Sequence, residues 1–145
     1  MVEIHIEDTA AIPGINPEFL FAWFSQVATA EGKTLGDINV IFCSDEYLLE
    51  MNRSHLDHDY YTDIITFDYS EEDVVSGDLF ISMDRVADNA QGLDHDFMDE
   101  LNRVCVHGLL HLCGYKDKSE EDEQMMRNKE DEMLGLRKFH VEHLK

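Results

Sequence analysis

Two histidines four residues apart carry the strongest chemical signal in the sequence. In His107-Gly-Leu-Leu-His111 the spacing places both imidazoles on one face of a helix, one turn apart. Two ring nitrogens so placed can bind one metal ion at about 2.0–2.1 Å. Gly114 would end the helix, and Asp117 could then return to the same ion. Two imidazoles and a carboxylate leave a position open for water, which is typical of catalytic zinc sites.

The same spacing also has a structural explanation, because two histidines four apart occur by chance on long helices. Gly108 is unfavourable inside a helix by about 0.8–1.0 kcal/mol relative to Ala. It therefore indicates close approach to the backbone, either by a ligand or by a tightly packed sheet. Gly108 also stands where the H-E-x-x-H motif of zinc peptidases has its Glu, which disfavours classical peptide hydrolysis.

The eleven residues from His107 to Asp117, HGLLHLCGYKD, resemble the signature H-G-x-L-H-L-x-G-Y-D-H of the YbeY family. These are bacterial metal-dependent endoribonucleases of rRNA maturation. Further segments resemble family motifs in the same order along most of residues 36–117: Ser44-Asp45-Glu46 with Met51-Asn52, Thr62-Asp63-Ile64-Ile65-Thr66-Phe67, and Gly77-Asp78-Leu79-Phe80-Ile81-Ser82.

The mixture of expected strands and helices, with the long helices late, indicates a single α+β domain over residues 1–145 with a small mixed sheet. The expected metal site on the long helix is zincin-like. The resemblance implies a zinc-dependent, single-strand-specific endoribonuclease acting in maturation of the 3′ end of 16S rRNA and in ribosome quality control. One divalent ion, zinc, would be held by His107, His111 and Asp117. The expected partners are an rRNA precursor and ribosomal proteins or a ribosome-associated GTPase, with no DNA and no membrane, in the cytoplasm.

Three residues outside the ligand set are predicted to be catalytic. Asp78 is the first candidate for a base, because the resemblance places it near the metal; a carboxylate capping a turn at a strand start is the structural alternative. Arg103 is one turn before His107 and shares its helix face. Lys116 could add positive charge beside the metal.

The sequence departs from the family pattern at the site itself. Asp117 stands where the family has a third His, which should reduce the Lewis acidity of the metal and could favour another divalent ion. Lys116 replaces the Asp before it. The family's Arg after the S-D-E helix aligns with Leu56, and Arg53, about one turn earlier, is the nearest substitute.

The chain is very acidic, with 11 Lys and Arg against 32 Asp and Glu and a net charge of −21. This argues against long-range attraction to nucleic acid or anionic lipid. Residues 54–84 contain no Lys or Arg at all. The acidic surface could instead recruit a basic ribosomal protein. The candidates for an RNA-facing groove are Lys33, Arg53, Arg85, Arg103, Lys116 and Lys118.

Hydrophobic periodicity predicts the elements that must position these residues. Strands are expected over 2–7, 36–43, 64–69 and 78–83, the last two as a hairpin with a turn at Ser76-Gly77. Helices are expected over 17–32, 45–56, 84–91, 94–113 and 119–135, with no clear signal afterwards. Three cysteines in apolar surroundings suit a reducing compartment, and neither a secretory signal nor a membrane span is expected.

Two other functions are compatible with the same residues. One is a peptidase-like metal hydrolase, which would cleave casein and not RNA. The other is a non-catalytic ribosome-assembly module with a structural metal, in which His107→Ala would unfold the domain. His55 and His58, three apart in a polar stretch, could form a second metal site, but surface histidines are the simpler interpretation.

Overall fold

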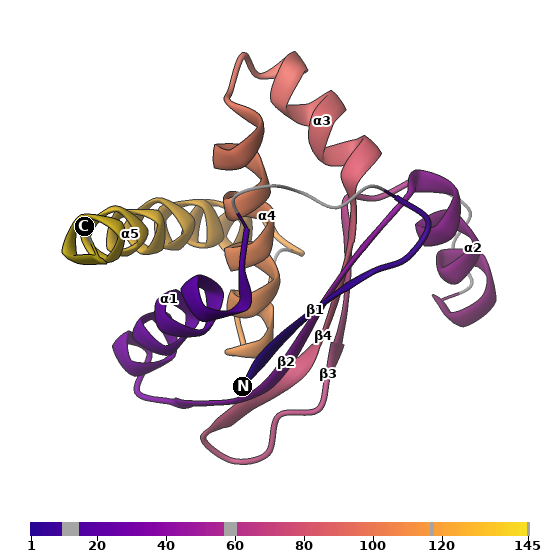
Figure 1. The fold of residues 1–145 in the computed structure, drawn as a ribbon. Helices are drawn as coiled ribbons and strands as arrows, with labels where there is room; N and C mark the ends of the chain where they lie inside the picture. Colours follow the sequence, from indigo (N-terminus) through magenta and orange to yellow (C-terminus); the bar gives the residue numbers. More distant parts are fainter. Residues whose placement is uncertain (10–14, 57–60, 117, 145) are drawn as a thin grey trace.

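The computed structural model describes residues 1–9, 15–56, 61–116 and 118–144, with side chains in the same ranges except at Leu56 and after Leu136. A sheet lies at its centre and helices flank it (Figure 1). The elements are β1 (Val2–Ile6), α1 (Pro17–Ala30), β2 (Thr34–Cys43), α2 (Asp45–Leu56), β3 (Ile64–Asp68), β4 (Val74–Ser82), α3 (Met83–Gly92), α4 (Phe97–Leu112) and α5 (Glu120–Leu144).

The sheet is mixed, as the sequence predicts. Its strand order is β1-β2-β4-β3, with β1 and β4 both parallel to β2 and with β3 antiparallel to β4. In this register Asn39 of β2 and Phe67 of β3 lie on either side of Asp78 in β4. The α+β fold class is confirmed, and the hairpin expected between the last two strands is β3–β4.

Alternation along β4 separates the two faces of the sheet. Gly77 and Leu79 face α4, because added Cβ atoms at Gly77 and Gly108 would lie 2.9 Å from side-chain atoms of Leu112 and Leu79 respectively. Phe80 faces the other way and stacks on Tyr47 of α2, with ring centroids 6.5 Å apart. Helices α1 and α4 cover one face of the sheet, α5 packs on these two helices, and α2 covers part of the opposite face (Figure 1).

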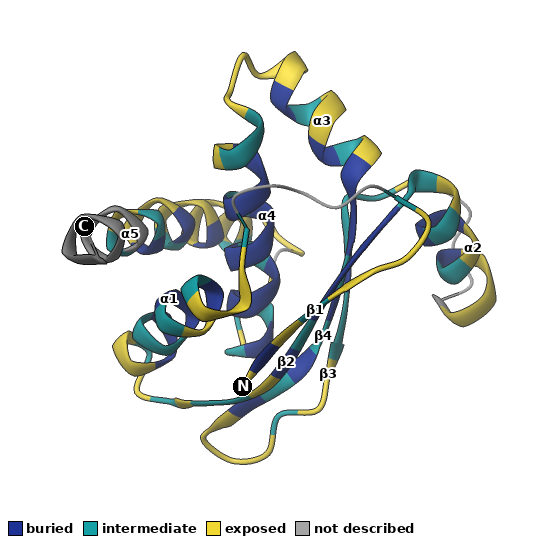
Figure 2. Ribbon diagram, viewed as in Figure 1, coloured by how far each residue is buried: buried dark blue, intermediate teal, exposed yellow. Residues whose placement is uncertain are grey.

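The main core lies between α1, α4, α5 and the sheet, where the ribbon is mostly buried (Figure 2). The indole Nε1 of Trp23 donates a buried hydrogen bond of 2.8 Å to the carbonyl of Met133, which joins α1 to α5. Cys43 and Cys105 are buried and Cys113 is half-buried. Among the described residues, no helix is long and apolar enough to cross a membrane.

Short polar side chains begin several helices where the sequence predicts them. The Asn16 side chain accepts the Phe19 N–H at 2.7 Å, and Pro17 follows it. Ser44 Oγ accepts the N–H of Tyr47 at the start of α2. Ser119 Oγ accepts the N–H of Asp122 at the start of α5. These caps fix where the helices begin.

Some predicted boundaries are wrong. Ser76-Gly77 is not a turn but part of β4; the chain reverses earlier, around Glu72, which has a φ of 53°. Gly77 is required because a Cβ there would lie 2.4 Å from the carbonyl oxygen of Phe67. The long helix begins at Phe97 and not at Asp94, whose φ is 55°. Helix α5 continues past residue 135 to Leu144.

Candidate metal centre

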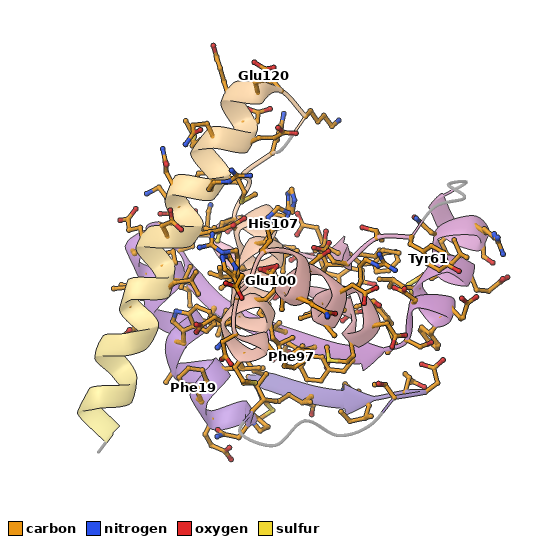
Figure 3. All side chains as sticks on the ribbon, turned by 90° about the horizontal axis from the view of Figure 1, so that it is seen from above. Phe19, Tyr61, Phe97, Glu100, His107 and Glu120 are labelled. Carbon is orange, nitrogen blue, oxygen red and sulfur yellow. The ribbon has the colours of Figure 1, made fainter. Side chains whose placement is uncertain are left out.

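His107 and His111 of α4 meet as the sequence predicts. Their Nε2 atoms lie 3.0 Å apart, and the two rings are nearly perpendicular, at 82°. Both side chains are partly buried. Seen from above, His107 lies where α5 passes α4, far from Tyr61 at the α2 end of the molecule (Figure 3).

Each imidazole uses its other nitrogen for a hydrogen bond to an acceptor. His107 Nδ1 lies 2.6 Å from Glu130 Oε2, and His111 Nδ1 lies 2.9 Å from the carbonyl oxygen of Tyr115. A carboxylate and a carbonyl can only accept, so both Nδ1 atoms carry the proton. In the neutral rings both Nε2 atoms are then lone-pair acceptors that face each other.

This arrangement fits a bound cation. Two facing lone pairs repel each other unless a positive charge lies between them. Two nitrogens that bind a tetrahedral zinc at about 2.05 Å are about 3.3 Å apart, close to the separation found here. Among the described residues, no group of three His, Cys, Asp or Glu side chains forms a metal cluster. The predicted third ligand, Asp117, lies outside the described residues.

The end of α4 brings the Tyr115 carbonyl to His111. The Gly114 N–H donates to the His111 carbonyl at 3.0 Å, and the Tyr115 N–H donates to the Leu110 carbonyl at 3.1 Å. These are the two hydrogen bonds of a Schellman motif, which needs a positive φ at the residue after the cap. Gly114 has a φ of 108°. The glycine in the motif therefore sets the orientation of the second imidazole.

Gly108 serves packing and not ligand access. A Cβ at this position would lie 2.6 Å from Cδ1 of Ile64 and 2.9 Å from Cδ2 of Leu79. The missing side chain lets α4 lie close against β3 and β4. Of the two explanations open from the sequence, the structure supports the tight helix–sheet contact.

Arg103 lies one turn before His107 and is bound by carboxylates. Its Nη1 donates to Glu130 Oε1 at 2.9 Å, and its Nη2 donates to Asp131 Oδ1 at 2.7 Å. Burial opposes the guanidinium charge, but the bonds to Asp131 and Glu130 raise the pKa of Arg103 above its ordinary value. Arg103 shares the helix face of His107, as the spacing predicts, but its donors are directed to α5.

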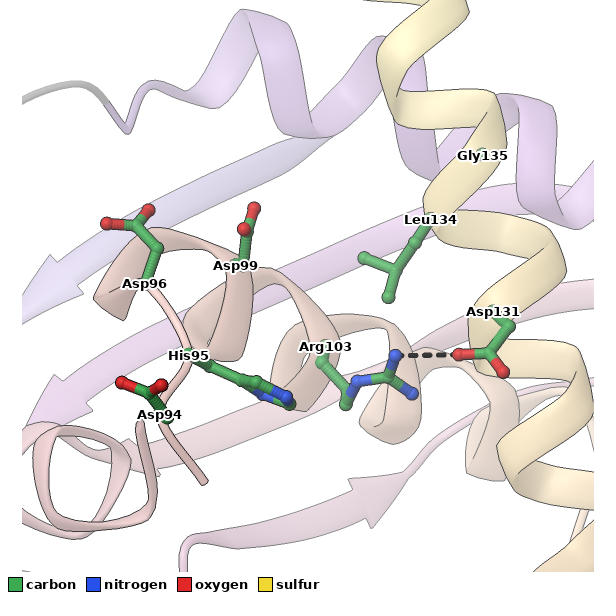
Figure 4. Close-up of a pocket in the computed structure, with 8 residues that line it drawn as sticks. All are labelled: Asp94, His95, Asp96, Asp99, Arg103, Asp131, Leu134 and Gly135. Carbon is green, nitrogen blue, oxygen red and sulfur yellow. Dashed lines mark hydrogen bonds and ion pairs between the residues drawn. The ribbon is translucent and has the colours of Figure 1, made fainter. Parts of the chain in front are cut away.

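Two neighbouring cavities open beside this face. One, of about 520 Å³, is lined by Asp63, Arg103, His107 and Glu130 among others. The second, of about 470 Å³, shares Arg103 and Asp131 with it and runs along the start of α4 (Figure 4). The second cavity is strongly acidic, with Asp94, Asp96 and Asp99 at its rim.

Asp63 is a carboxylate beside His107 that the sequence analysis does not select as a functional residue. It comes directly before β3 and lines the same cavity as His107. Burial raises the pKa of the Asp63 carboxyl, although a positive charge on nearby His107 acts in the opposite direction. The residue was visible in the T-D-I-I-T-F segment, but nothing in its spacing distinguishes it from other acidic residues.

Asp78 is not brought to the imidazoles. Because Gly77 and Leu79 face α4, the Asp78 side chain lies on the opposite face of the sheet. There it accepts a hydrogen bond of 3.0 Å from the Asn39 side-chain amide. It is part of a polar row on that face, and a role as base at the metal would require it to reach through the sheet.

The remaining predicted cations lie apart from the imidazoles or in the loop beyond α4. Lys116 is exposed, two residues after the Gly114 cap. Arg53 is exposed on α2, which packs on the other face of the sheet. Arg85 is bound to Asp45 at 2.7 Å and also lies over the Tyr61 ring. His55 is exposed on α2, and His58 lies outside the described residues.

Known proteins are similar to this chain over most of its length. Residues 2–137 match the family model described as Endoribonuclease YbeY. An Endoribonuclease YbeY from Cytophaga hutchinsonii is 59% identical over 118 residues, which cover 81% of this chain and 82% of the relative. One from Porphyromonas gingivalis is 52% identical over 126 residues, 87% of this chain and 83% of the relative.

The fold is also found in a solution structure of a protein from Thermotoga maritima. It superposes with a TM-score of 0.65 at 26% sequence identity, covering 97% of this chain and 93% of that one. The family match spans every element from β1 to most of α5, including the helix that carries both histidines. The chain described here belongs to the YbeY endoribonuclease family.

Proposed function

We propose that this protein is a metal-dependent endoribonuclease that hydrolyses phosphodiester bonds in single-stranded RNA. The observation that supports this most is the pair of Nε2 atoms 3.0 Å apart, each on a ring whose Nδ1 is bound to an acceptor. Membership of the YbeY family supports RNA as the substrate. In the reaction, water adds to phosphorus, one P–O bond breaks, and the leaving oxygen takes up a proton.

The proposed metal ligands are His107, His111 and Asp117, and the proposed metal is zinc. A divalent ion held there would act as a Lewis acid and lower the pKa of a water molecule. Replacing a His of the family motif by Asp117 adds a negative charge to the donor set, which could change the preferred ion. Elemental analysis of the purified protein would identify it.

Asp63 is the carboxylate that we propose as proton acceptor for the attacking water. It lines the cavity beside His107, whereas Asp78 lies across the sheet. A carboxyl with a raised pKa is a better base than an ordinary one once it is ionised. Exposed Lys116 is proposed to contact a phosphate, because Arg103 is bound by two carboxylates.

The proposed biological role is maturation of the 3′ end of 16S rRNA and ribosome quality control in the cytoplasm, in keeping with the family. The net charge of −21 suits a basic partner such as a ribosomal protein, or a ribosome-associated GTPase that presents a basic surface. Co-sedimentation with purified small ribosomal subunits at low salt tests this role. Failure to sediment with them would contradict it.

The activity is tested with the purified protein, single-stranded RNA, an RNA duplex of the same sequence, and casein. Cleavage of the single strand alone is expected, and it should disappear in His111→Ala with an unchanged melting curve. Cleavage of casein alone would instead indicate a peptidase-like hydrolase. Unfolding of His107→Ala and His111→Ala, with no RNA cleavage by the wild type, would indicate a structural metal.

A further inference from the structure

Glu130 occupies the centre of a chain of polar contacts that joins α5 to the first imidazole. We infer that Glu130 is a positioning residue, which holds His107 in the tautomer and orientation needed to bind a metal ion, and that Arg103 in turn holds Glu130. This inference rests on the proposed metal site, and it gives Arg103 a role other than phosphate binding.

The two oxygens of Glu130 have separate partners. Oε2 accepts from Nδ1 of His107 at 2.6 Å, and Oε1 accepts from Nη1 of Arg103 at 2.9 Å. The carboxylate cannot rotate without losing one of these bonds. The residue is only 7% exposed, so little water is available to replace either bond. Glu130 is therefore held rigidly where it meets the imidazole.

The contact decides which nitrogen of His107 is available. An ionised carboxylate only accepts, so it keeps the proton on Nδ1 and leaves the Nε2 lone pair directed at His111. Without Glu130 the ring could carry its proton on Nε2, where it would occupy the metal position. The negative charge also makes the imidazole a stronger ligand, as carboxylates bound to zinc-ligating histidines do.

A purely structural explanation accounts for fewer of these contacts. Glu130 follows Met126 by four residues and precedes Met133 by three, and both methionines are buried on the inner face of α5. An apolar residue there would join α5 to the core without the cost of burying a charge. Asp131, which is exposed, also binds Arg103 and could link the two helices alone. The bond to His107 is what Glu130 adds.

Zinc affinity of the full-length chain tests the inference, measured by competition with a chromophoric chelator. Glu130→Gln keeps the shape of the side chain and removes its charge. The expected effect is about 10–100-fold weaker zinc binding, the usual range for the loss of such a partner. Glu132→Gln is the matched control, because it makes the same change two residues away at a side chain that is 59% exposed. Its zinc affinity should stay within about twofold of the wild type.

A second measurement separates positioning from loss of fold. In NMR spectra of the zinc-loaded wild type, the His107 Nδ1 proton should resonate far downfield, because it is bonded to a carboxylate. In Glu130→Gln this resonance should move upfield while the melting curve of the metal-free protein shows a folded domain. Glu130→Asp should recover part of the lost affinity by restoring the charge.

The outcomes separate the inference from the proposed function. Equal zinc affinity in the wild type and Glu130→Gln, with an unmoved Nδ1 resonance, would overturn the positioning role and leave the metal site intact. Equal weakening in Glu130→Gln and Glu132→Gln would also overturn it, because the effect would then follow net charge. A wild-type chain that binds no zinc would contradict the metal site itself, and the positioning role with it.

Discussion

Two arginine–carboxylate clusters lie at opposite ends of this molecule and look alike as charge pairs. The α2 cluster consists of Asp45, Ser82, Arg85 and Asp88, and the α5 cluster consists of Arg103, His107, Glu130 and Asp131. In each, a guanidinium nitrogen lies 2.7 Å from an aspartate oxygen. Each arginine is partly exposed, at 33% and 28% of its side chain.

The two clusters differ in where their contacts end. In the α2 cluster, Asp45 accepts from the hydroxyl of Ser82 at 2.7 Å, and Ser82 Oγ accepts the N–H of Arg85 at the start of α3. These contacts join the start of α2 to the start of α3, and the pair of Arg85 with Asp88 is a surface ion pair within α3. In the α5 cluster the contacts end at an imidazole whose second nitrogen faces another imidazole. An ion pair alone does not indicate function. A series of hydrogen bonds that fixes an imidazole with its Nε2 lone pair directed at a second imidazole does indicate a binding site.

Replacing either imidazole of the α5 side should have the largest effect on RNA cleavage, and this effect distinguishes the two clusters. His107→Ala and His111→Ala should each lower RNA cleavage by at least about 10³-fold, because each removes one of the few protein ligands of the proposed metal. Melting of the metal-free protein should change little for His111→Ala, and for His107→Ala by about 1–3 kcal/mol at most, the loss of one partly buried hydrogen bond to Glu130. The measurements are single-turnover cleavage of a labelled single-stranded RNA and thermal melting with a chelator present.

The control is a variant of the α2 cluster that is tested in the same two assays. Asp88→Asn alters a surface ion pair with Arg85 that is 3.4 Å long, so it should leave both cleavage and melting nearly unchanged. Loss of cleavage in this variant comparable to that of the histidine variants would remove the proposed difference between the clusters.

Asp63 should give the next largest effect. Asp63→Asn is expected to lower the cleavage rate by about 100-fold, the lower end of the range for loss of a general base. Zinc affinity should stay within a few-fold of the wild type, because Asp63 is not a proposed ligand. Rate and zinc affinity measured on the same preparation test this. A normal rate in Asp63→Asn would exclude it as the base.

The part of the site that lies on one helix could be predicted from the sequence. His107 and His111 are four residues apart, and helical geometry alone brings their Nε2 atoms together. Gly114 likewise predicts the end of α4 from a local rule about positive φ. The caps at Asn16, Ser44 and Ser119 were predictable for the same reason. Local periodicity and turn chemistry need no knowledge of tertiary packing.

The rest of the site depends on contacts between distant segments. Glu130 is 23 residues from His107 and on another helix, so no local rule links them. One sign was present: Glu130 stands at the helical spacing, four residues after Met126 and three before Met133, where the buried stripe of α5 would place an apolar residue. The position of Asp78 relative to the imidazoles could not be predicted, because the order of motifs along the chain does not say which face of the sheet a side chain is on. Only the register, with Gly77 and Leu79 against α4, shows that its side chain is directed away.

Substitutions in the α2 cluster should lower the stability of the fold and leave zinc affinity unchanged. Arg85→Gln removes two bonds to Asp45, at 2.7 Å and 3.4 Å, and the contact with the Tyr61 ring. The expected loss is about 1–2 kcal/mol, reduced by the partial exposure of Arg85, which lowers Tm by about 2–8 °C. Zinc affinity should be unchanged. Weaker zinc binding in a folded Arg85→Gln would show that the two clusters are coupled.

The smallest expected effect is the pH dependence of the stability that Asp45 of the α2 cluster contributes. Burial alone would raise the pKa of Asp45, but its hydrogen bonds from Arg85 and Ser82 outweigh burial and hold that pKa below the ordinary 3.8. A lowered carboxyl pKa contributes stability that is present above about pH 4 and is lost as pH falls through the folded-state value. Asp45→Asn has no such proton to bind. Its stability deficit relative to the wild type should therefore shrink, by less than about 1 kcal/mol, between about pH 4.5 and pH 3. Denaturant unfolding at a series of pH values measures this, and a deficit that stays constant to pH 3 would mean that Asp45 is not held ionised by its partners.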